Sequence, residues 1–131
     1  MYLLDTDHCV FFIRGQAQVV EAFDAHSSDE VAVSIITVGE LYFGALRSAR
    51  KEQNLARCRE FVRRINVVGL DEDVMLHFAT IKADLASRGE LIEDPDLLIA
   101  ACALARGLIL ITHNTDHFGR IADLEMEDWH A

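Results

Sequence analysis

Short apolar segments alternate along the chain with longer segments whose apolar residues recur at helical spacing. Leu55, Cys58, Phe61, Val62 and Ile65, for example, follow one face of a helix. The pattern predicts strands over residues 2–5, 31–34, 66–70, 108–112 and 124–126, and helices over residues 7–13, 16–25, 36–49, 52–65, 71–87, 95–106 and 115–120. Strands that alternate with helices in this order predict an α/β fold, with a mostly parallel central sheet of about five strands flanked by α-helices.

The length and composition of the chain indicate one folded domain. With 131 residues, 51% of them hydrophobic, the chain can bury its own core, and we expect a single domain over residues 1–131. Its apolar runs, such as residues 97–105, are too short to cross a bilayer, which needs about 20 residues, and its N-terminus has no basic leader. We therefore expect a cytoplasmic protein without membrane association, whose three cysteines are reduced thiols.

Carboxylates follow some of the predicted strands and begin one of the predicted helices. The strand over residues 2–5 ends in Asp5, which therefore lies at the carboxyl edge of the sheet, where α/β proteins place their sites. Asp5 is the strongest candidate for a metal ligand. Asp7 follows Thr6 at a predicted helix start, where an aspartate caps the helix or supports a neighbouring ligand.

Glu40 can be interpreted in two ways. The segment Thr37-Val38-Gly39-Glu40 matches the capping-box pattern, in which the glutamate bonds back to the start of its own helix. If the helix begins near Ser34 instead, Glu40 lies almost two turns into it and points elsewhere. The spacing alone leaves both possibilities open.

Asp96 lies just inside a helix that begins at Asp94-Pro95. Proline at the first helical position leaves Asp94 as the N-cap and Asp96 in the first turn, where the helix dipole favours a negative charge. Acids in a first turn are common and usually carry no function. This helix, however, is apolar on every side from Leu97 to Ala103, so we expect it to be buried and Asp96 to point into a central cleft.

The strand over residues 108–112 leads into a polar loop that contains the last candidates, Asn114 and Asp116. His113 and His117 have a zinc-like spacing, but no paired cysteines accompany them, so we do not expect a zinc site. Several carboxylates at one edge require a cation, because two of them about 4 Å apart repel by roughly 4 kcal/mol. Oxygen ligands suit Mg²⁺ or Mn²⁺, which can orient a water molecule for attack on a phosphodiester.

The charge of the chain is unevenly distributed. Taken alone, the net charge of −10 argues against a nucleic-acid partner. One short stretch nevertheless holds more than half of the 12 basic residues. They are Arg47, Arg50, Lys51, Arg57, Arg59, Arg63 and Arg64. A solvated helix face explains this stretch as well as a polyanion-binding ridge does, and the charge pattern leaves both open.

Five segments of the chain, in order and with suitable spacing, resemble the PIN-domain ribonucleases of the VapC toxin kind. They are Leu3-Leu4-Asp5-Thr6, Ser34-Ile35-Ile36-Thr37-Val38-Gly39-Glu40-Leu41, Asp96-Leu97-Leu98-Ile99-Ala100-Ala101, Ile111-Thr112-His113-Asn114 and Leu124-Glu125-Met126-Glu127-Asp128-Trp129. The resemblance implies a single PIN-like nuclease domain that acts as a metal-dependent endoribonuclease on RNA, with transfer RNA as the expected substrate. It also implies a toxin that forms a homodimer and is neutralised by a VapB-like antitoxin.

The resemblance also implies roles for individual residues. Asp5 and Asp96 are expected to bind the metal ion, directly or through water. Glu40 and Asp116 are expected to complete the acidic pocket and to help position the attacking water. The residues expected to support these groups are Thr6, Asp7, Thr112 and Asn114.

Three positions depart from the family pattern. Asp7 stands where family members mostly carry asparagine, which adds an acid beside the site. Asn114 occupies a position that is often acidic, and His117 precedes Phe118 where close relatives have a glutamate before the phenylalanine. The fourth acid is therefore absent from its usual positions, and Asp116 is the replacement candidate.

The expected partners follow from the charges. RNA is expected on a ridge formed by Arg57, Arg59, Arg63 and Arg64. The antitoxin is expected to insert arginine or lysine among Asp5, Glu40 and Asp96, displacing the metal ion. Two other functions stay open at this point: a non-catalytic binding module of the same fold, and a haloacid-dehalogenase-like phosphatase. The phosphatase has less support, because its later motifs do not fit into the short segment after Thr112.

Overall fold

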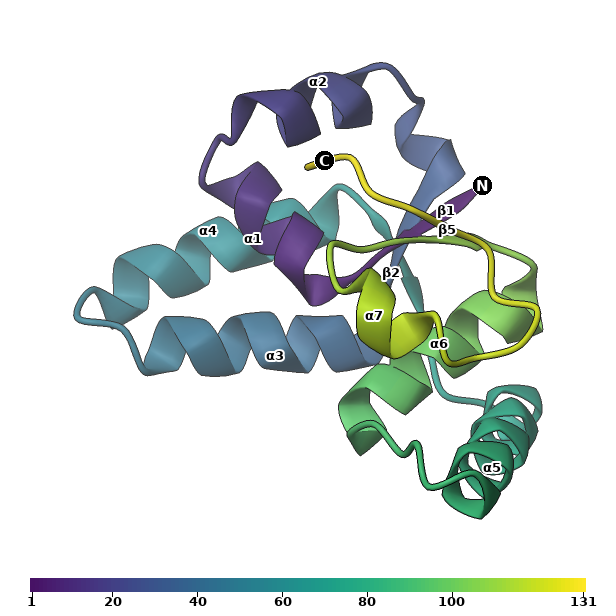
Figure 1. Ribbon diagram of the computed structural model, residues 1–131. Helices are drawn as coiled ribbons and strands as arrows, with labels where there is room; N and C mark the ends of the chain where they lie inside the picture. Colours follow the sequence, from purple (N-terminus) through teal and green to yellow (C-terminus); the bar gives the residue numbers. More distant parts are fainter.

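β1 (Tyr2–Leu4) lies at the centre of a five-stranded sheet in which every strand runs parallel to its neighbours (Figure 1). The computed structural model describes residues 1–131, and the strand order is β3-β2-β1-β4-β5. The other strands are β2 (Val31–Ser34), β3 (Asn66–Val68), β4 (Ile109–Ile111) and β5 (Met126–Glu127). The predicted α/β class and the parallel sheet of five strands are confirmed.

The helices occur where the periodicity predicted them, with small shifts at their ends. They are α1 (Thr6–Ile13), α2 (Ala17–Asp24), α3 (Ile35–Leu46), α4 (Lys51–Arg63), α5 (Glu72–Ser87), α6 (Asp94–Arg106) and α7 (Thr115–Phe118), with a 3₁₀ turn over Ser28–Glu30. None of them combines the length and apolar character that a bilayer-spanning helix requires. In Figure 1, α3 and α4 run side by side and extend beyond the rest of the molecule.

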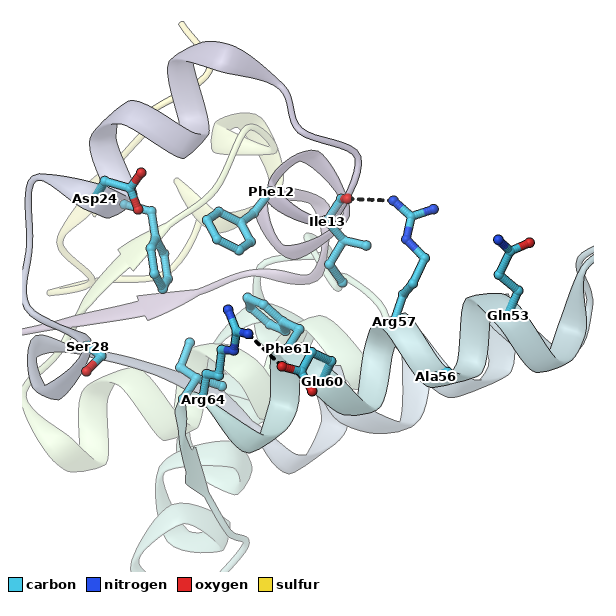
Figure 2. Close-up of a pocket in the computed structure, with 12 residues that line it drawn as sticks. Phe12, Ile13, Asp24, Ser28, Gln53, Ala56, Arg57, Glu60, Phe61 and Arg64 are labelled. Carbon is cyan, nitrogen blue, oxygen red and sulfur yellow. Dashed lines mark hydrogen bonds and ion pairs between the residues drawn. The ribbon is translucent and has the colours of Figure 1, made fainter.

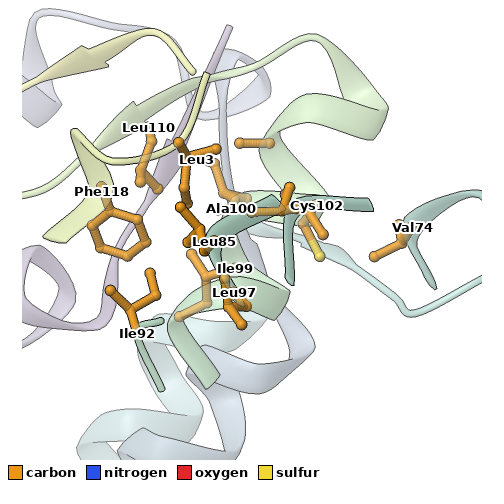
Figure 3. Packing of buried hydrophobic residues seen from close by; sticks show 14 of the residues in the cluster. Leu3, Val74, Leu85, Ile92, Leu97, Ile99, Ala100, Cys102, Leu110 and Phe118 are labelled. Atoms are coloured by element: carbon orange, nitrogen blue, oxygen red, sulfur yellow. The ribbon is translucent and has the colours of Figure 1, made fainter. Parts of the chain in front are cut away.

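Successive residues of a strand point to opposite faces of the sheet, and each face has its own hydrophobic cluster. On one face, Leu3 and Leu110 pack with residues of α5 and α6 and with Phe118 (Figure 3). On the other face, Leu4 and Ile111 pack with residues of α1, α3 and α4. The alternation therefore fixes both layers of helices relative to β1.

α6 is the most deeply buried helix. Leu97 and every residue from Ile99 to Ala103 have no exposed surface, as the apolar run predicted. The helix begins one residue earlier than predicted, with Glu93 as its N-cap and Asp94 at the first helical position. Such a shift is within the usual variation of helix boundaries, and Asp96 still lies in the first turn.

The register of the central strands brings the candidate residues together. Leu4 lies opposite Val33 on one side and Ile111 on the other. The residues that follow these three positions, Asp5, Ser34 and Thr112, therefore leave the sheet at the same edge. All three cysteines are free and buried, in agreement with the prediction of reduced thiols.

Candidate active site

Asp5 connects the central strand to α1 and is almost fully buried, with 6% of its surface exposed. Its Oδ1 accepts a hydrogen bond of 2.8 Å from the Thr6 backbone N–H and so caps α1. Its Oδ2 accepts a hydrogen bond of 2.8 Å from the Thr112 hydroxyl, and Thr112 itself has no exposed surface. Since each carboxylate oxygen has two lone pairs, both oxygens of Asp5 can still accept a further ligand.

The surroundings of Asp5 disfavour its negative charge. Burial and the nearby Asp7 carboxylate raise the pKa of Asp5 from its ordinary value of 3.8 to about 7, and Asp96 adds to the rise. The hydrogen bonds from Thr112 and Thr6 act in the opposite direction but do not cancel it. A buried carboxylate whose pKa rises because other acids lie close by is typical of a functional site.

Glu40 points away from the start of its own helix. α3 begins at Ile35 with Ser34 as its N-cap, so Glu40 lies well inside the helix, and the capping-box alternative is wrong. Its Oε1 accepts a hydrogen bond of 2.6 Å from the Thr6 hydroxyl, which also lies 3.1 Å from the hydroxyl of Thr37. Thr6 therefore connects the Glu40 carboxylate to the turn that carries Asp5.

Asp96 is half-buried in the first turn of α6, and its carboxyl is also destabilised as an anion. Burial and the Glu40 carboxylate raise the pKa of Asp96, with smaller contributions from Glu93 and Asp7, whereas the imidazole of His117 lowers it. Asp5 at the N-cap of α1, Glu40 in α3 and Asp96 in α6 thus belong to one group of interacting acids. No sequence-local pattern shows this directly, because the three lie 35 or more residues apart.

Asp7 belongs to a closed set of contacts, which we call the Asp7–His8–Asp128–His113 ring. His8 Nδ1 donates to Asp7 Oδ1 over 2.9 Å, and the His113 backbone N–H donates to Asp7 Oδ2, also over 2.9 Å. Asp128 completes the ring, with Oδ2 2.7 Å from His113 Nδ1 and Oδ1 3.3 Å from His8 Nε2. Asp7 therefore holds the loop after β4 directly through His113 and the segment around Asp128 indirectly through His8.

Two members of this ring were missed by the sequence analysis. His8 is fully buried and its Nε2 accepts a hydrogen bond of 3.1 Å from the Trp129 backbone. Burial raises the pKa of Asp128, but hydrogen bonds from the His130 backbone and the His113 ring outweigh it, so the pKa is lowered overall. The only signal in the sequence is the His beside Asp7, because His8 and Asp128 lie at opposite ends of the chain.

The loop after β4 places its candidates unequally. The Thr112 hydroxyl accepts a 3.0 Å hydrogen bond from the Asn114 backbone N–H, and Asn114 Nδ2 lies 3.1 Å from His117 Nδ1. Asp116 is exposed, and no hydrogen bond or ion pair joins it to another candidate residue. The structure therefore brings Asn114 and His117 toward the acids but not Asp116, whose role as the fourth acid stays a prediction.

The donor set fits a divalent cation in its chemistry. Asp5 and Asp96 offer carboxylate oxygens whose negative charge is not compensated by any arginine or lysine within ion-pair distance. Hard ions such as Mg²⁺ prefer such oxygens and keep several of their own waters, so they need few direct protein ligands. No three His, Cys, Asp or Glu side chains are close enough together to hold an ion between them.

The four arginines of the expected ridge lie on different faces of α4. Arg57 donates to the Ile13 carbonyl over 2.9 Å, and Arg64 pairs with Glu60 over 2.6 Å; both line a groove of about 880 Å³ formed by α1, α2 and α4 (Figure 2). Arg59 is exposed on another face, because two residues along a helix correspond to a rotation of about 200°. Clustering in the sequence therefore does not produce one continuous basic surface here.

Comparison with known proteins identifies the family and the fold. The PIN domain family matches residues 2–124. The chain therefore belongs to the PIN domain family, and the phosphatase alternative is set aside. The matched range contains four of the five segments that carried the resemblance, with Asp5, Glu40 and Asp96, and only Leu124 of the fifth.

Individual relatives match along nearly their whole length. The chain is 39% identical over 129 residues to a Shigella flexneri protein named tRNA(fMet)-specific endonuclease VapC, covering 98% of this chain and 97% of the relative. The Salmonella typhimurium VapBC complex bound to DNA superposes with a TM-score of 0.92 at 36% identity, covering 98% of this chain and 97% of the other. VapBC2 of Rickettsia felis, bound to a promoter DNA fragment, also has a TM-score of 0.92, at 29% identity and 98% coverage of both chains.

Proposed function

We propose that this protein is a metal-dependent endoribonuclease and the toxin of a VapBC-type toxin–antitoxin pair. The observation that carries the proposal is the buried Asp5 carboxylate, whose pKa burial and neighbouring acids raise to about 7 in a chain of the PIN domain family. A bound divalent cation would remove the repulsion that this arrangement creates. Transfer RNA is the proposed substrate, supported by the name of the Shigella flexneri relative.

Asp5 and Asp96 are the proposed ligands of Mg²⁺ or Mn²⁺, which would supply an activated water and stabilise charge on the phosphate. Glu40 is the proposed acceptor of a proton from that water. Thr6 holds one oxygen of Glu40, and no protein donor contacts the other, so that oxygen can accept a proton. Thr112 fixes the Asp5 carboxylate from the opposite side.

The proposed inhibitor is a VapB-like chain with a basic segment that enters among the acids. An arginine or lysine would satisfy the same carboxylates that otherwise require a metal ion. The groove in Figure 2 offers such a partner an apolar surface, because Phe12, Phe23 and Phe61 line it. VapBC complexes of relatives support the existence of this kind of partner.

A homodimer is proposed through the outer face of α3. Ile35, Phe43 and Leu46 are exposed on this helix, Phe43 by 62%, and helical geometry places them within one sector of its surface. Large apolar side chains exposed together mark an interaction surface. Phe43→Lys should convert the dimer to a monomer in analytical ultracentrifugation, and an unchanged sedimentation coefficient would exclude this face.

The function is tested by incubating the purified protein with total RNA and mapping the new 5′ ends by sequencing. Cleavage should require a divalent ion, stop with a chelator, and disappear in Asp5→Asn and Asp96→Asn. Fragments that arise from transfer RNA would support the proposed substrate. RNA binding without cleavage in any divalent metal would show instead that the protein is a non-catalytic binding module.

A further inference from the structure

A second, smaller pocket lies between α1, α3 and α4 and reaches one of the acids, Glu40. Its volume is about 230 Å³, and Glu40 forms part of its wall. The same carboxylate accepts the hydrogen bond from Thr6. A group bound in this pocket would therefore be in contact with the proposed active site.

Two arginines without carboxylate partners form the cationic part of this pocket. Arg14 ends α1, and Arg57 reaches from α4 to donate one hydrogen bond to the Ile13 carbonyl. Other arginines pair with acids, as Arg88 does with Asp84, but neither Arg14 nor Arg57 lies within 4.0 Å of a carboxylate. Since a guanidinium has five N–H donors, both retain donors for an anion.

The remaining wall combines a polar edge with apolar surface. Asn54 Nδ2 donates to Ser48 Oγ over 2.8 Å, and Ser48 Oγ donates to the Ala45 carbonyl over 2.6 Å. This leaves the Asn54 carbonyl oxygen as an acceptor at the edge of the pocket. Leu41 and Gly44 contribute apolar surface from α3, and Gly44 leaves open space where a side chain would stand.

We propose that this pocket binds one nucleotide of the RNA strand next to the bond that is cleaved. Arg14 and Arg57 would hold its phosphate, and the base would pack on the α3 wall with Asn54 at its edge. The pocket is smaller than the roughly 300–1,000 Å³ of typical small-molecule sites, which suits a single base. The proposal rests on the proposed ribonuclease function and assigns part of its specificity to these residues.

Charge favours RNA over the antitoxin as the occupant. The part of the inhibitor proposed to enter among the acids is basic, and Arg14 and Arg57 repel it. Arg57 also borders the larger groove, where only the apolar part of the inhibitor is proposed to lie. The same two side chains attract a phosphate, and Arg binds phosphate through two parallel hydrogen bonds. The cation would therefore bind at the acids, and the phosphate of the nucleotide would bind at the two arginines.

Gly44→Met tests the pocket by filling it. A Cβ at position 44 meets no atom within 4 Å, and methionine is a better helix former than glycine, so the variant should fold. In the cleavage-inactive Asp5→Asn background, Gly44→Met should weaken binding of a short RNA at least tenfold, measured by fluorescence anisotropy with a chelator present. Gly69→Met, at a position that is equally open but outside both the pocket and α3, should bind RNA as Asp5→Asn alone does.

A charge test supplements the steric one and does not depend on the folding of Gly44→Met. Arg14→Gln with Arg57→Gln should reduce the slope of log affinity against log salt by about 1.4, as expected for two lost contacts to a single strand. Arg88→Gln with Arg106→Gln changes the net charge equally but lies outside the pocket, so it should leave the slope unchanged.

The outcomes separate the two proposals. If the unsubstituted chain cleaves RNA but Gly44→Met and the Arg14/Arg57 variant both bind it normally, the pocket is not a nucleotide site. If these variants lose affinity for the antitoxin and keep it for RNA, the occupant is a protein segment and the inference is overturned. If the unsubstituted chain neither binds nor cleaves RNA, the proposed function fails and the inference fails with it.

Discussion

Asp5→Asn should stabilise the protein while it abolishes cleavage. In the absence of metal, folding buries an acid whose charge is unfavourable, so the folded state binds a proton more tightly than the unfolded state does. A pKa that is raised on folding contributes stability below the unfolded value, and this contribution is lost as the pH rises through the folded value. For Asp5 the window runs from 3.8 to about 7.

The size of the effect follows from the same two values. One pKa unit corresponds to about 1.36 kcal/mol, so the rise from 3.8 to about 7 corresponds to roughly 4 kcal/mol of unfolding free energy lost across the window. Asparagine avoids this loss, but the amide NH₂ that replaces Oδ2 cannot accept the hydrogen bond from the Thr112 hydroxyl, which costs about 1 kcal/mol. We expect a net gain of about 2–3 kcal/mol at pH 8, that is, a Tm increase of roughly 10 °C. Near pH 4 only the hydrogen-bond cost remains, and we expect a loss of about 1 kcal/mol.

Urea unfolding of both proteins at pH 4, 5, 6, 7 and 8 with a chelator present measures this difference. Asp116→Asn is the matched control, because its side chain is exposed and its unfolding free energy should stay parallel to that of the unsubstituted protein. If Asp5→Asn is less stable by a constant amount at every pH, Asp5 acts through its hydrogen bonds and the electrostatic reasoning is wrong. Added Mg²⁺ should raise the Tm of the unsubstituted protein and have little effect on Asp5→Asn.

Three further predictions test other parts of the site. Thr6→Val removes the hydroxyl that holds Glu40 at nearly constant volume, so kcat should fall several-fold with a small change in Tm; an unchanged kcat would show that Glu40 does not need this contact. Asp116→Asn should lower cleavage only a few-fold, since no contact connects it to the acids, and a loss as complete as that of Asp5→Asn would identify it as the fourth acid. His8→Ala should lower the unfolding free energy by about 2–4 kcal/mol in urea titrations. His77→Ala should have little effect, because the half-buried His77 contacts only its own helix; equal stability of the two variants would show that the ring contributes nothing.

The fold and the position of Asp5 could be predicted because both depend on local patterns. Alternation along β1 assigns Leu3 and Leu4 to opposite layers, and the apolar run of α6 from Leu97 requires burial on all sides. Asp5 directly follows a buried strand, so the sheet fixes its place regardless of what surrounds it. Local sequence patterns are therefore sufficient to predict the two layers, the burial of α6 and the place of Asp5.

The remainder of the site depends on contacts between distant segments. Whether Glu40 caps its own helix or joins Asp5 is decided by Ser34, which caps α3, and by Thr6, which lies 34 residues away from Glu40. The partnership of His8 with Asp128 spans almost the whole chain and has no local signal. The division of the arginines of α4 between faces, in contrast, follows from helical rotation and could be derived from residue numbers.

The Asp7–His8–Asp128–His113 ring joins residues that are synthesised early to residues that are synthesised much later, and this order affects when the site can form. Asp5 and Asp7 are synthesised more than 100 residues before Thr112 and His113, which hold them, and Asp128 follows later still. The two acids therefore take their places only after the segment that contains Asp128 has left the ribosome. For an enzyme that cleaves RNA, we expect this order to keep each nascent copy inert until that segment has packed against the N-terminal acids.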